Sequence, residues 1–153
     1  MDAFRAMPGH LIRRVQQVST ALFTEECGRF DLTSVQFAAL SAIADHPDMD
    51  ATRLSAIIAF DRSTIGSVLE RLEAKGWVSR HPSALDRRVK RLRCTEAGAT
   101  LLQDVAPAVA RVQARLLAPL SPPDRAAMLR FLRLLADTQE ATPAPLRLAA
   151  NEG

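Results

Sequence analysis

The stretch that decides the fold runs from Leu54 to Gly98 and reads LSAIIAFDRSTIGSVLERLEAKGWVSRHPSALDRRVKRLRCTEAG. Its first half predicts two short helices joined by a tight turn. In the first helix, Leu54, Ile57 and Ile58 recur at three- and four-residue spacing, which gives the helix one apolar face. Asp61 comes after this pattern ends, and its side chain can accept hydrogen bonds from the free amides of the helix that follows.

The second of these helices has one apolar side and an unusually slim opposite side. At about 100° per residue, the apolar side consists of Ile65, Val68, Leu69 and Leu72. The opposite side consists of Ser63, Ser67, Glu70 and Ala74. Solvated helices usually carry long charged residues, whereas a helix that enters a DNA major groove needs short donors and acceptors near its N-terminus. Gly76 is predicted to end the helix.

A basic hairpin follows the two helices. Residues 77–79 and 89–94 have strand character and flank a polar loop that contains Pro82 and Ser83. The basic residues of the tip and the returning strand, beside Asp86, are Arg87, Arg88, Lys90, Arg91 and Arg93. From position 53 to position 93 there are ten Lys or Arg against four Asp or Glu, whereas the whole chain carries only +3. Positive charge concentrated in this way is typical of a surface that binds nucleic acid.

The run DRSTIGSVLERLEAKGWVSR, followed by DRRVKRLRCTEAG, resembles the winged helix-turn-helix of the MarR (multiple antibiotic resistance regulator) family of bacterial transcription factors. The resemblance covers roughly residues 32–102 in detail. It departs from the usual pattern at Gly66, inside the recognition helix, and at Cys94, where an aliphatic residue is more common. The resemblance implies a mainly α fold with a small β-hairpin, in which a winged helix-turn-helix lobe is joined to a helical dimerisation region.

Length and helical patterning extend this organisation to the whole chain. A chain of 153 residues suits a single domain, here 1–153. We expect dimerisation helices at about 8–31 and 99–141, the winged helix-turn-helix at about 32–98, and a mobile tail at 142–153. Thr33 and Asp50 are predicted to cap helices, Thr95 to open a long helix that Pro107 bends, and Ser121 to cap the last helix.

Composition excludes several other classes of protein. The sequence has no run of about 18 apolar residues and no apolar leader at its start, so we expect a cytoplasmic protein without a membrane span. Three scattered histidines give no metal-ligand spacing, and no phosphate-binding loop or cofactor motif is present. We therefore expect neither an enzyme nor a resident cofactor. The absence of tyrosine also disfavours an RNA-binding sheet that stacks bases on exposed rings.

Roles within the DNA-reading unit follow from residue type and position. Ser63, Thr64 and Ser67 are candidates for contacts with base edges or nearby phosphates, and Arg62 and Arg71 for phosphate or guanine contacts. The resemblance implies that one arginine of the Asp-Arg-Arg run enters the minor groove while the other is braced by the aspartate. We assign Arg87 to the groove and Arg88 to the pair with Asp86, with Lys90 nearby. The alternative for each arginine is a solvated surface charge.

The resemblance also implies a homodimer on a palindromic operator, with half-sites about 10 bp apart. The alternative is a monomer whose terminal helices pack on each other. A small aromatic carboxylate is the implied effector, bound between the dimerisation helices and the DNA lobe. His10 and Arg14 are the candidates for its carboxylate, and Leu11, Phe37 and Leu40 for its apolar walls.

Three alternatives stay open from the sequence. Arg14 can instead form an intersubunit salt bridge, with His10 as a satisfied polar neighbour. Cys27 or Cys94 can act as a redox-sensing thiol, although a lone cysteine is more often a small buried hydrophobe. A helical adaptor that does not bind DNA is the remaining class, and the basic hairpin argues against it.

Overall fold

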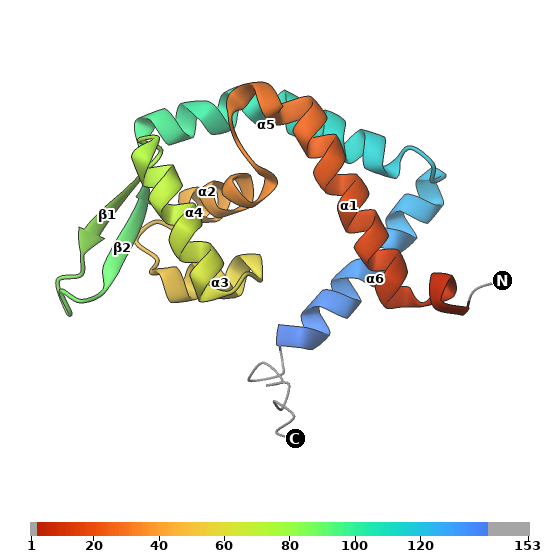
Figure 1. Ribbon diagram of the computed structural model, residues 1–153, viewed down its shortest axis with the longest axis horizontal. Coiled ribbons are helices and arrows are strands. Elements are labelled where there is room, and N and C mark those ends of the chain that lie inside the picture. The colour runs from red at the N-terminus through yellow and green to blue at the C-terminus, as the bar shows by residue number, and fades with distance from the viewer. Residues whose placement is uncertain (1–2, 141–153) are drawn as a thin grey trace, which may run out of the picture. The chain divides into compact units, whose positions relative to one another are not determined.

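The computed structural model describes residues 3–140 as a mainly helical chain with one β-hairpin (Figure 1). Its elements are η1 (Ala3–Ala6), α1 (Pro8–Cys27), η2 (Gly28–Phe30), α2 (Ser34–Asp45), α3 (Ala51–Ile58), α4 (Arg62–Ala74), β1 (Val78–Pro82), β2 (Lys90–Cys94), α5 (Glu96–Leu117) and α6 (Pro122–Glu140). The described chain divides between Leu116 and Leu117 into two units. The tail predicted at 142–153 lies outside the described residues.

Side-chain caps start the helices of the DNA lobe where the sequence predicts them. Thr33 and Gln36 form a reciprocal capping box at the start of α2, with nitrogen-to-oxygen distances of 3.1 and 3.2 Å. The Asp50 carboxylate accepts a hydrogen bond of 2.8 Å from the Arg53 amide and begins α3. The Asp61 carboxylate likewise accepts a hydrogen bond from the Thr64 amide and begins α4. Because each cap satisfies amides that the helix itself leaves unpaired, these local contacts fix the boundaries of the lobe's helices.

The end of α4 is also set by local hydrogen bonds. Gly76 has φ +75°, in the left-handed region, and follows the C-cap residue Lys75. The Gly76 amide donates to the Glu73 carbonyl at 2.9 Å, and the Trp77 amide donates to the Leu72 carbonyl at 3.0 Å. This pair of bonds is a Schellman motif, which explains why the helix stops at the predicted glycine and the chain continues as a strand.

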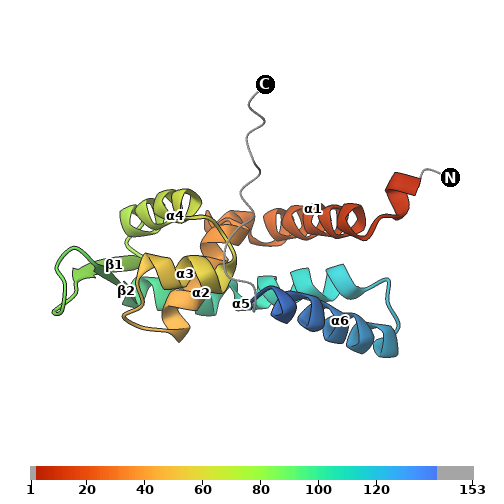
Figure 2. The same cartoon turned by 90° about the horizontal axis from the view of Figure 1, so that it is seen from below.

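The hairpin is antiparallel, and its register runs from Val78 opposite Cys94 to Pro82 opposite Lys90. The prediction that Pro82 belongs to the loop was wrong, because β1 continues through it. A proline is tolerated there since it occupies the last pair of a two-stranded edge, where a missing amide donor costs little. Figure 2 shows the loop of the hairpin extending beyond α3 and α4.

One hydrophobic core holds α2, α3, α4 and the hairpin together. Its fully buried large side chains include Leu40, Ile43, Leu54, Ile65, Leu69, Leu72 and Leu92. The predicted inner face of α4 is therefore confirmed. Ile57 of α3, in contrast, is 44% exposed, because it lies about 60° around the short helix from the buried Leu54.

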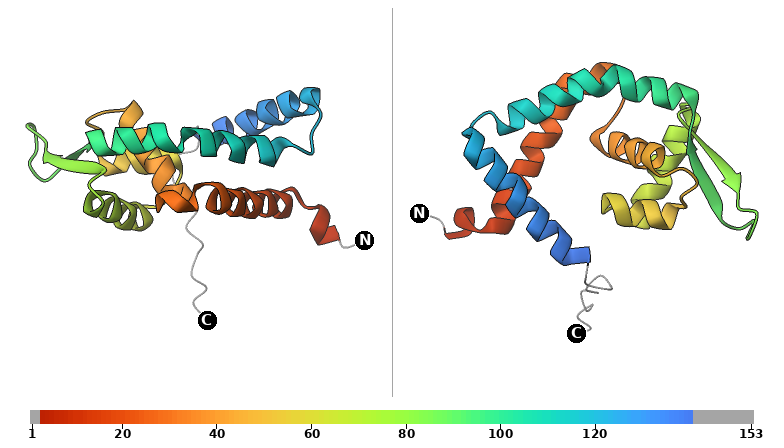
Figure 3. Two further views of the ribbon diagram at one scale, coloured as in Figure 1. Left: turned by 90° about the horizontal axis from the view of Figure 1, so that it is seen from above. Right: turned by 180° about the vertical axis from the view of Figure 1, so that it is seen from behind.

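A second core joins the end of α1 to α5, so the helices on either side of the DNA lobe in the sequence meet within one chain (Figure 3). It contains Phe23, Cys27, Leu32, Val105, Ala108 and Val112. At its edge, Glu26 accepts hydrogen bonds from Arg111 at 2.7 Å and from Arg115 at 3.1 Å. The hydrogen bond from Arg111 lowers the pKa of Glu26, so the carboxylate stays charged at neutral pH. The fold class predicted from the sequence is thus correct.

The start of α5 is packed tightly against the end of the recognition helix. The Thr95 hydroxyl donates to the Gly76 carbonyl at 2.6 Å and accepts a bond of 3.1 Å from the Gly98 amide. A Cβ at Gly98 would lie 2.9 Å from the Cys94 sulfur and would overlap the Trp77 carbonyl oxygen. This close approach requires glycine at position 98.

We predict opposite effects for alanine at two helical glycines. Gly98→Ala should lower the free energy of unfolding by about 1–3 kcal/mol, because the added methyl group meets backbone that cannot move away. Gly66→Ala should raise it by about 0.5–1 kcal/mol, because an added Cβ meets nothing within 4 Å and the helix interior favours alanine. Urea unfolding at matched protein concentration measures both changes. Equal effects of the two substitutions would contradict the tight joint at Gly98.

Candidate nucleic-acid interface and ligand cavity

The exposed start of α4 is organised by the Asp61 carboxylate. The Ser63 hydroxyl donates to Asp61 Oδ1 at 2.7 Å, and the Thr64 hydroxyl donates to Asp61 Oδ2 at 3.0 Å. Their protons therefore point back into the protein, and their oxygen lone pairs remain available as acceptors. Ser67 is exposed and its side chain has no hydrogen-bond partner within residues 3–140, so it can donate or accept.

These hydrogen bonds also fix the charge of Asp61. The backbone amide of Thr64, followed by the Ser63 and Thr64 hydroxyls, lowers the pKa of Asp61 to about 2. The carboxylate is consequently ionised across the ordinary pH range. Ser63 and Thr64 therefore have a charged acceptor beside them at neutral pH.

The two predicted arginines of α4 lie in different surroundings. Arg62 donates to the Thr52 hydroxyl and so lies across the start of α3. Arg71 lies about 80° around the helix from Ser63, on the flank that faces α1 and α2. Its contact with DNA stays a prediction.

At the hairpin tip, one arginine is braced and its neighbour is not. The Arg88 guanidinium binds both carboxylate oxygens of Asp86, at 3.1 and 3.2 Å, and its amide donates to Asp86 at 3.0 Å. The predicted pair is therefore present, and it holds the pKa of Asp86 below its usual value. Arg87 and Lys90 are exposed, and neither side chain has a hydrogen bond or ion pair with any described residue.

The other two basic residues of the returning strand, Arg91 and Arg93, contact Asp48 in the loop before α3. Arg93 binds the Asp48 carboxylate at 2.5 Å, which lowers the pKa of Asp48, and Arg91 donates to the Asp48 carbonyl at 3.3 Å. Alternation along β2 points both side chains toward the loop before α3. Both side chains thus have a partner within the protein, although Arg93 is still 55% exposed. Asp48, with φ +66°, is the residue that sequence reasoning missed, because its partners lie more than 40 positions away.

The predicted ligand residues are not gathered at one place within a single chain. His10 is half-buried against the Phe4 ring, with ring centroids 4.6 Å apart, whereas Leu11 and Arg14 are exposed on the same half of α1. Phe37 contacts Phe23, and Phe23 lies roughly 20 Å along α1 from His10. Leu40 is fully buried in the core of the DNA lobe.

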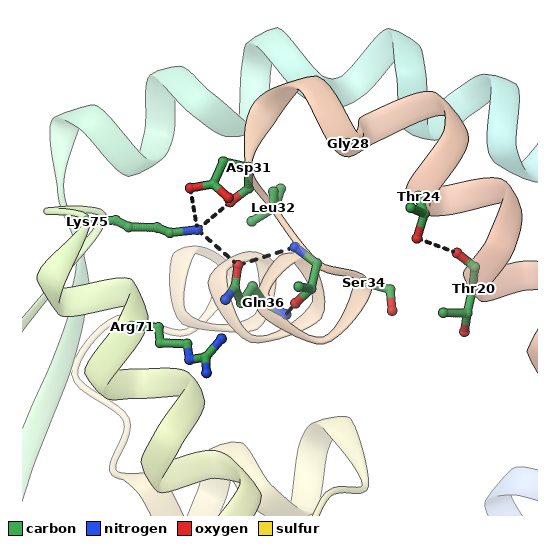
Figure 4. A pocket seen from close by; sticks show the side chains of 10 residues that line it. Thr20, Thr24, Gly28, Asp31, Leu32, Ser34, Gln36, Arg71 and Lys75 are labelled. Atoms are coloured by element: carbon green, nitrogen blue, oxygen red, sulfur yellow. Dashed lines mark hydrogen bonds and ion pairs between the residues drawn. The ribbon is translucent and has the colours of Figure 1, made fainter.

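The structure contains a cavity of about 590 Å³ that borders α1, the connection to α2, and α4 (Figure 4). Its lining consists of Thr20, Thr24, Gly28, Asp31, Leu32, Thr33, Ser34, Gln36, Arg71 and Lys75. A second cavity, of about 460 Å³, lies between α2 and α5 and includes Phe37. The first cavity has no signature in the sequence, because its residues come from segments more than 30 positions apart.

The cysteines and the acidic residues suggest neither a reactive thiol nor a metal site. Cys27 is fully buried and Cys94 is half-buried, and burial raises the pKa of both thiols. A raised pKa lowers the fraction of reactive thiolate. Within residues 3–140, no group of three or more His, Cys, Asp or Glu side chains is arranged to hold a metal ion. No helix in that part of the chain could cross a membrane.

Taken with the two cores, the slim exposed face of α4 and the projecting basic hairpin define a winged helix-turn-helix protein (Figures 2 and 3). Residues 30–89 match the model of the MarR family. The chain is 35% identical over 132 residues to the HTH-type transcriptional repressor NicR of Pseudomonas putida, a match that covers 86% of this chain and 84% of NicR. The chain therefore belongs to the MarR family of DNA-binding transcriptional regulators, which are not enzymes.

Solved structures agree with this assignment. Bordetella bronchiseptica BpsR, whose DNA binding is regulated by 6-hydroxynicotinic acid, is similar with a TM-score of 0.84 and 28% identity over 90% of this chain and 98% of BpsR. The transcriptional repressor CouR, solved bound to a 23-mer DNA duplex, is similar with a TM-score of 0.82 and 27% identity over 89% of this chain and 96% of CouR.

The lowered pKa of Asp61 predicts a specific acid dependence for Asp61→Asn. Asparagine retains the cap but does not titrate, so the variant lacks the stabilisation that the charged carboxylate provides. That stabilisation is complete above the ordinary pKa of 3.8 and is lost as the pH falls toward about 2. Thermal unfolding should therefore show a Tm deficit at neutral pH that shrinks between about pH 4 and pH 2. A deficit that stays constant with pH would contradict the assignment.

Proposed function

We propose that this protein is a homodimeric repressor, acting in the cytoplasm, that binds a palindromic operator and releases it when a small aromatic carboxylate binds. The observation that carries the proposal is the arrangement of the DNA lobe. A helix face with hydroxyl groups bonded to Asp61 and a hairpin tip whose Arg87 has no partner among residues 3–140 both face solvent. NicR, a repressor by name, supports the direction of regulation.

In this proposal, α4 enters the major groove with its N-terminal half. Ser63 and Thr64, as acceptors, suit the amino groups of adenine and cytosine, and Ser67 suits either kind of base edge. Arg62 lies beside them and contacts a phosphate. Arg71 lies on the flank of α4 that borders the cavity. In this proposal it contacts a phosphate at the edge of the interface.

The hairpin supplies the second contact with DNA. Arg87 enters the minor groove, where the electrostatic potential is most negative at narrow sequences. Asp86 holds Arg88 in place beside it, and Lys90 lies within the same basic surface and contacts the phosphate backbone. This division of roles follows from which cations already have partners in the protein.

Dimerisation would cover an apolar stripe on α1. Leu11, Val15 and Val18 are 46%, 41% and 52% exposed, although they recur at helical spacing. A second copy that contributes its own regions 8–31 and 99–141 would bury such a stripe by two-fold symmetry. The duplex bound to CouR is a 23-mer, which is about two helical turns and long enough for two half-sites.

In the proposed dimer, both protomers contribute residues to the effector pocket. His10 and Arg14 would bind the carboxylate, and Leu11 and Phe37 would contact the ring. Since His10 lies roughly 20 Å along α1 from the residue that contacts Phe37, these groups can meet only if the second protomer contributes some of them. Leu40, fully buried beneath α2, would support the floor of the pocket rather than contact the ligand.

We predict that Arg87→Ala weakens operator binding about tenfold or more and reduces the salt dependence by about one phosphate-equivalent charge. The matched control is Arg93→Ala, which removes the same charge from the same hairpin but from a side chain bound to Asp48. The control should lower stability and leave the slope of log affinity against log salt nearly unchanged. Fluorescence anisotropy over a salt series measures both slopes. Intact binding by Arg87→Ala would remove Arg87 from the interface.

For the effector, we predict that 6-hydroxynicotinate releases the wild-type protein from its operator in a gel-shift titration. Arg14→Ala should bind the operator normally but fail to respond, because the carboxylate has lost its guanidinium partner. Arg13→Ala removes the neighbouring arginine, which lies on a different side of α1, and should respond like the wild type. Equal responses from both variants would exclude Arg14 from the pocket.

A further inference from the structure

We infer that the ion pair between Glu73 of α4 and Arg80 of β1 fixes the angle between the recognition helix and the hairpin. Glu73 is therefore a positioning residue, which acts on DNA through the hairpin-tip residue Arg87 and touches no nucleotide itself. The effect on DNA binding rests on the proposed function. The effect on the hairpin does not, so it can be measured without DNA.

The ion pair joins the two elements across the turn at Gly76. Glu73 lies in the last turn of α4, and Arg80 lies in the middle of β1. Arg80 Nε lies 2.6 Å from Glu73 Oε2, and the Arg80 side chain is only 29% exposed. The Nε atom itself is buried, and Glu73 is the only ion-pair partner of Arg80 among residues 3–140. This partly buried cation therefore depends on one carboxylate for its counter-charge.

The hydrophobic core fixes the base of the hairpin but not its outer half. Val78 and Leu92 are buried in the core of the DNA lobe, whereas His81 and Pro82, which follow along β1, are exposed. Arg80 is directly opposite Leu92 in the register, so both side chains lie on the face of the hairpin that packs against the lobe. In the described chain, Arg80 is the last residue of β1 whose side chain is bound to another element.

The opposite face of the hairpin is held by a different element. Arg91 and Arg93 flank Leu92 along β2, so their side chains lie on the other face, where they bind Asp48. Asp48 belongs to the loop before α3, and its contacts do not involve α4. Among the ion pairs of the described residues, the one at Glu73 is therefore the contact that ties the hairpin to the helix that reads DNA.

The angle matters because the proposed interface has two parts in two grooves. Ser63 and Ser67 of α4 must meet the major groove while Arg87 meets the minor groove beside it. β1 continues for two residues beyond Arg80, roughly 7 Å, before the loop that carries Arg87 begins. A small rotation of the hairpin is therefore amplified at its tip. A hairpin that is already held in place loses less conformational freedom on binding, which favours affinity.

Operator binding by Glu73→Ala separates positioning from simple electrostatics by its sign. Loss of a negative charge should strengthen binding to a polyanion, whereas loss of the ion pair should weaken operator binding about threefold to fivefold. Glu96→Ala is the matched control, because it removes an exposed carboxylate beyond the end of β2 that has no ion pair in the described chain. This control should not weaken binding. Glu73→Gln keeps an acceptor for Arg80 and should restore part of the affinity.

A double-mutant cycle tests whether Glu73 acts through the hairpin tip. In the Arg87→Ala background, Glu73→Ala should cost little further affinity, because the side chain that it positions is already gone. A general weakening of the fold would instead multiply the two losses. Circular dichroism confirms that each variant is folded, which the 48% exposure of the Glu73 side chain favours.

A distance measurement on the DNA-free protein tests the hairpin directly. Spin labels at Leu85→Cys, which is 92% exposed at the tip, and at Ser67→Cys on α4 report the distance between the two elements by pulsed electron paramagnetic resonance. A Cys94→Ser background removes the half-buried thiol, and Cys27 is fully buried. Dilution with unlabelled protein restricts the signal to distances within one chain. The distribution should shift or broaden in Glu73→Ala and stay unchanged in Glu96→Ala.

Three outcomes would overturn the positioning role. They are operator binding by Glu73→Ala that is unchanged or tighter, losses that multiply in the double variant, and a distance distribution that Glu73→Ala leaves unaltered. If Arg87→Ala itself bound the operator normally, the proposed role of the hairpin tip would fail instead. The distance measurement would still decide whether Glu73 holds the hairpin, because it contains no DNA.

Discussion

The structure of the DNA lobe depends on the burial of one face of α4. Ile65, Leu69 and Leu72 pack against α2, α3 and the hairpin, and each fully buried side chain contributes about 1.5–3 kcal/mol relative to exposure. Because an α-helix is rigid, fixing this face also fixes the direction of the opposite one. The Schellman motif at Gly76 and the close contact at Gly98 then hold the hairpin and α5 at the end of the same helix.

Acidic residues decide which parts of the surface can contact a polyanion. Asp61 accepts hydrogen bonds from two hydroxyl groups, the Asp48 carboxylate binds Arg93 while its backbone carbonyl accepts from Arg91, and Asp86 braces Arg88. These pairings leave a small set of cations, including Arg87 and Lys90, without partners in the described chain. The basic charge counted in the sequence is therefore divided between side chains with partners in the described chain and side chains without them. The unpaired cations of the hairpin lie at its tip, where they can reach a minor groove.

Local features could be predicted from the sequence, and long-range ones could not. The helix caps at Thr33, Asp50 and Asp61 depend on residues within three positions, so the local sequence was sufficient to predict them. Asp48 meets its arginine partners only because β2 packs beside the loop before α3. The cavity at Arg71 likewise requires the tertiary arrangement of α1, α2 and α4. Burial is equally a tertiary property: Leu40, predicted as a pocket wall, lies in the core of the DNA lobe.

The central claim is that two copies of this lobe, related by two-fold symmetry, read two half-sites on one duplex. Selection of binding sites from a library of random duplexes tests it most directly, because the selection itself reveals the operator sequence. We expect the enriched sequences to contain an inverted repeat whose half-site centres are about 10 bp apart, one helical turn. Enrichment of a single half-site without symmetry, or no enrichment at low salt, would contradict the claim.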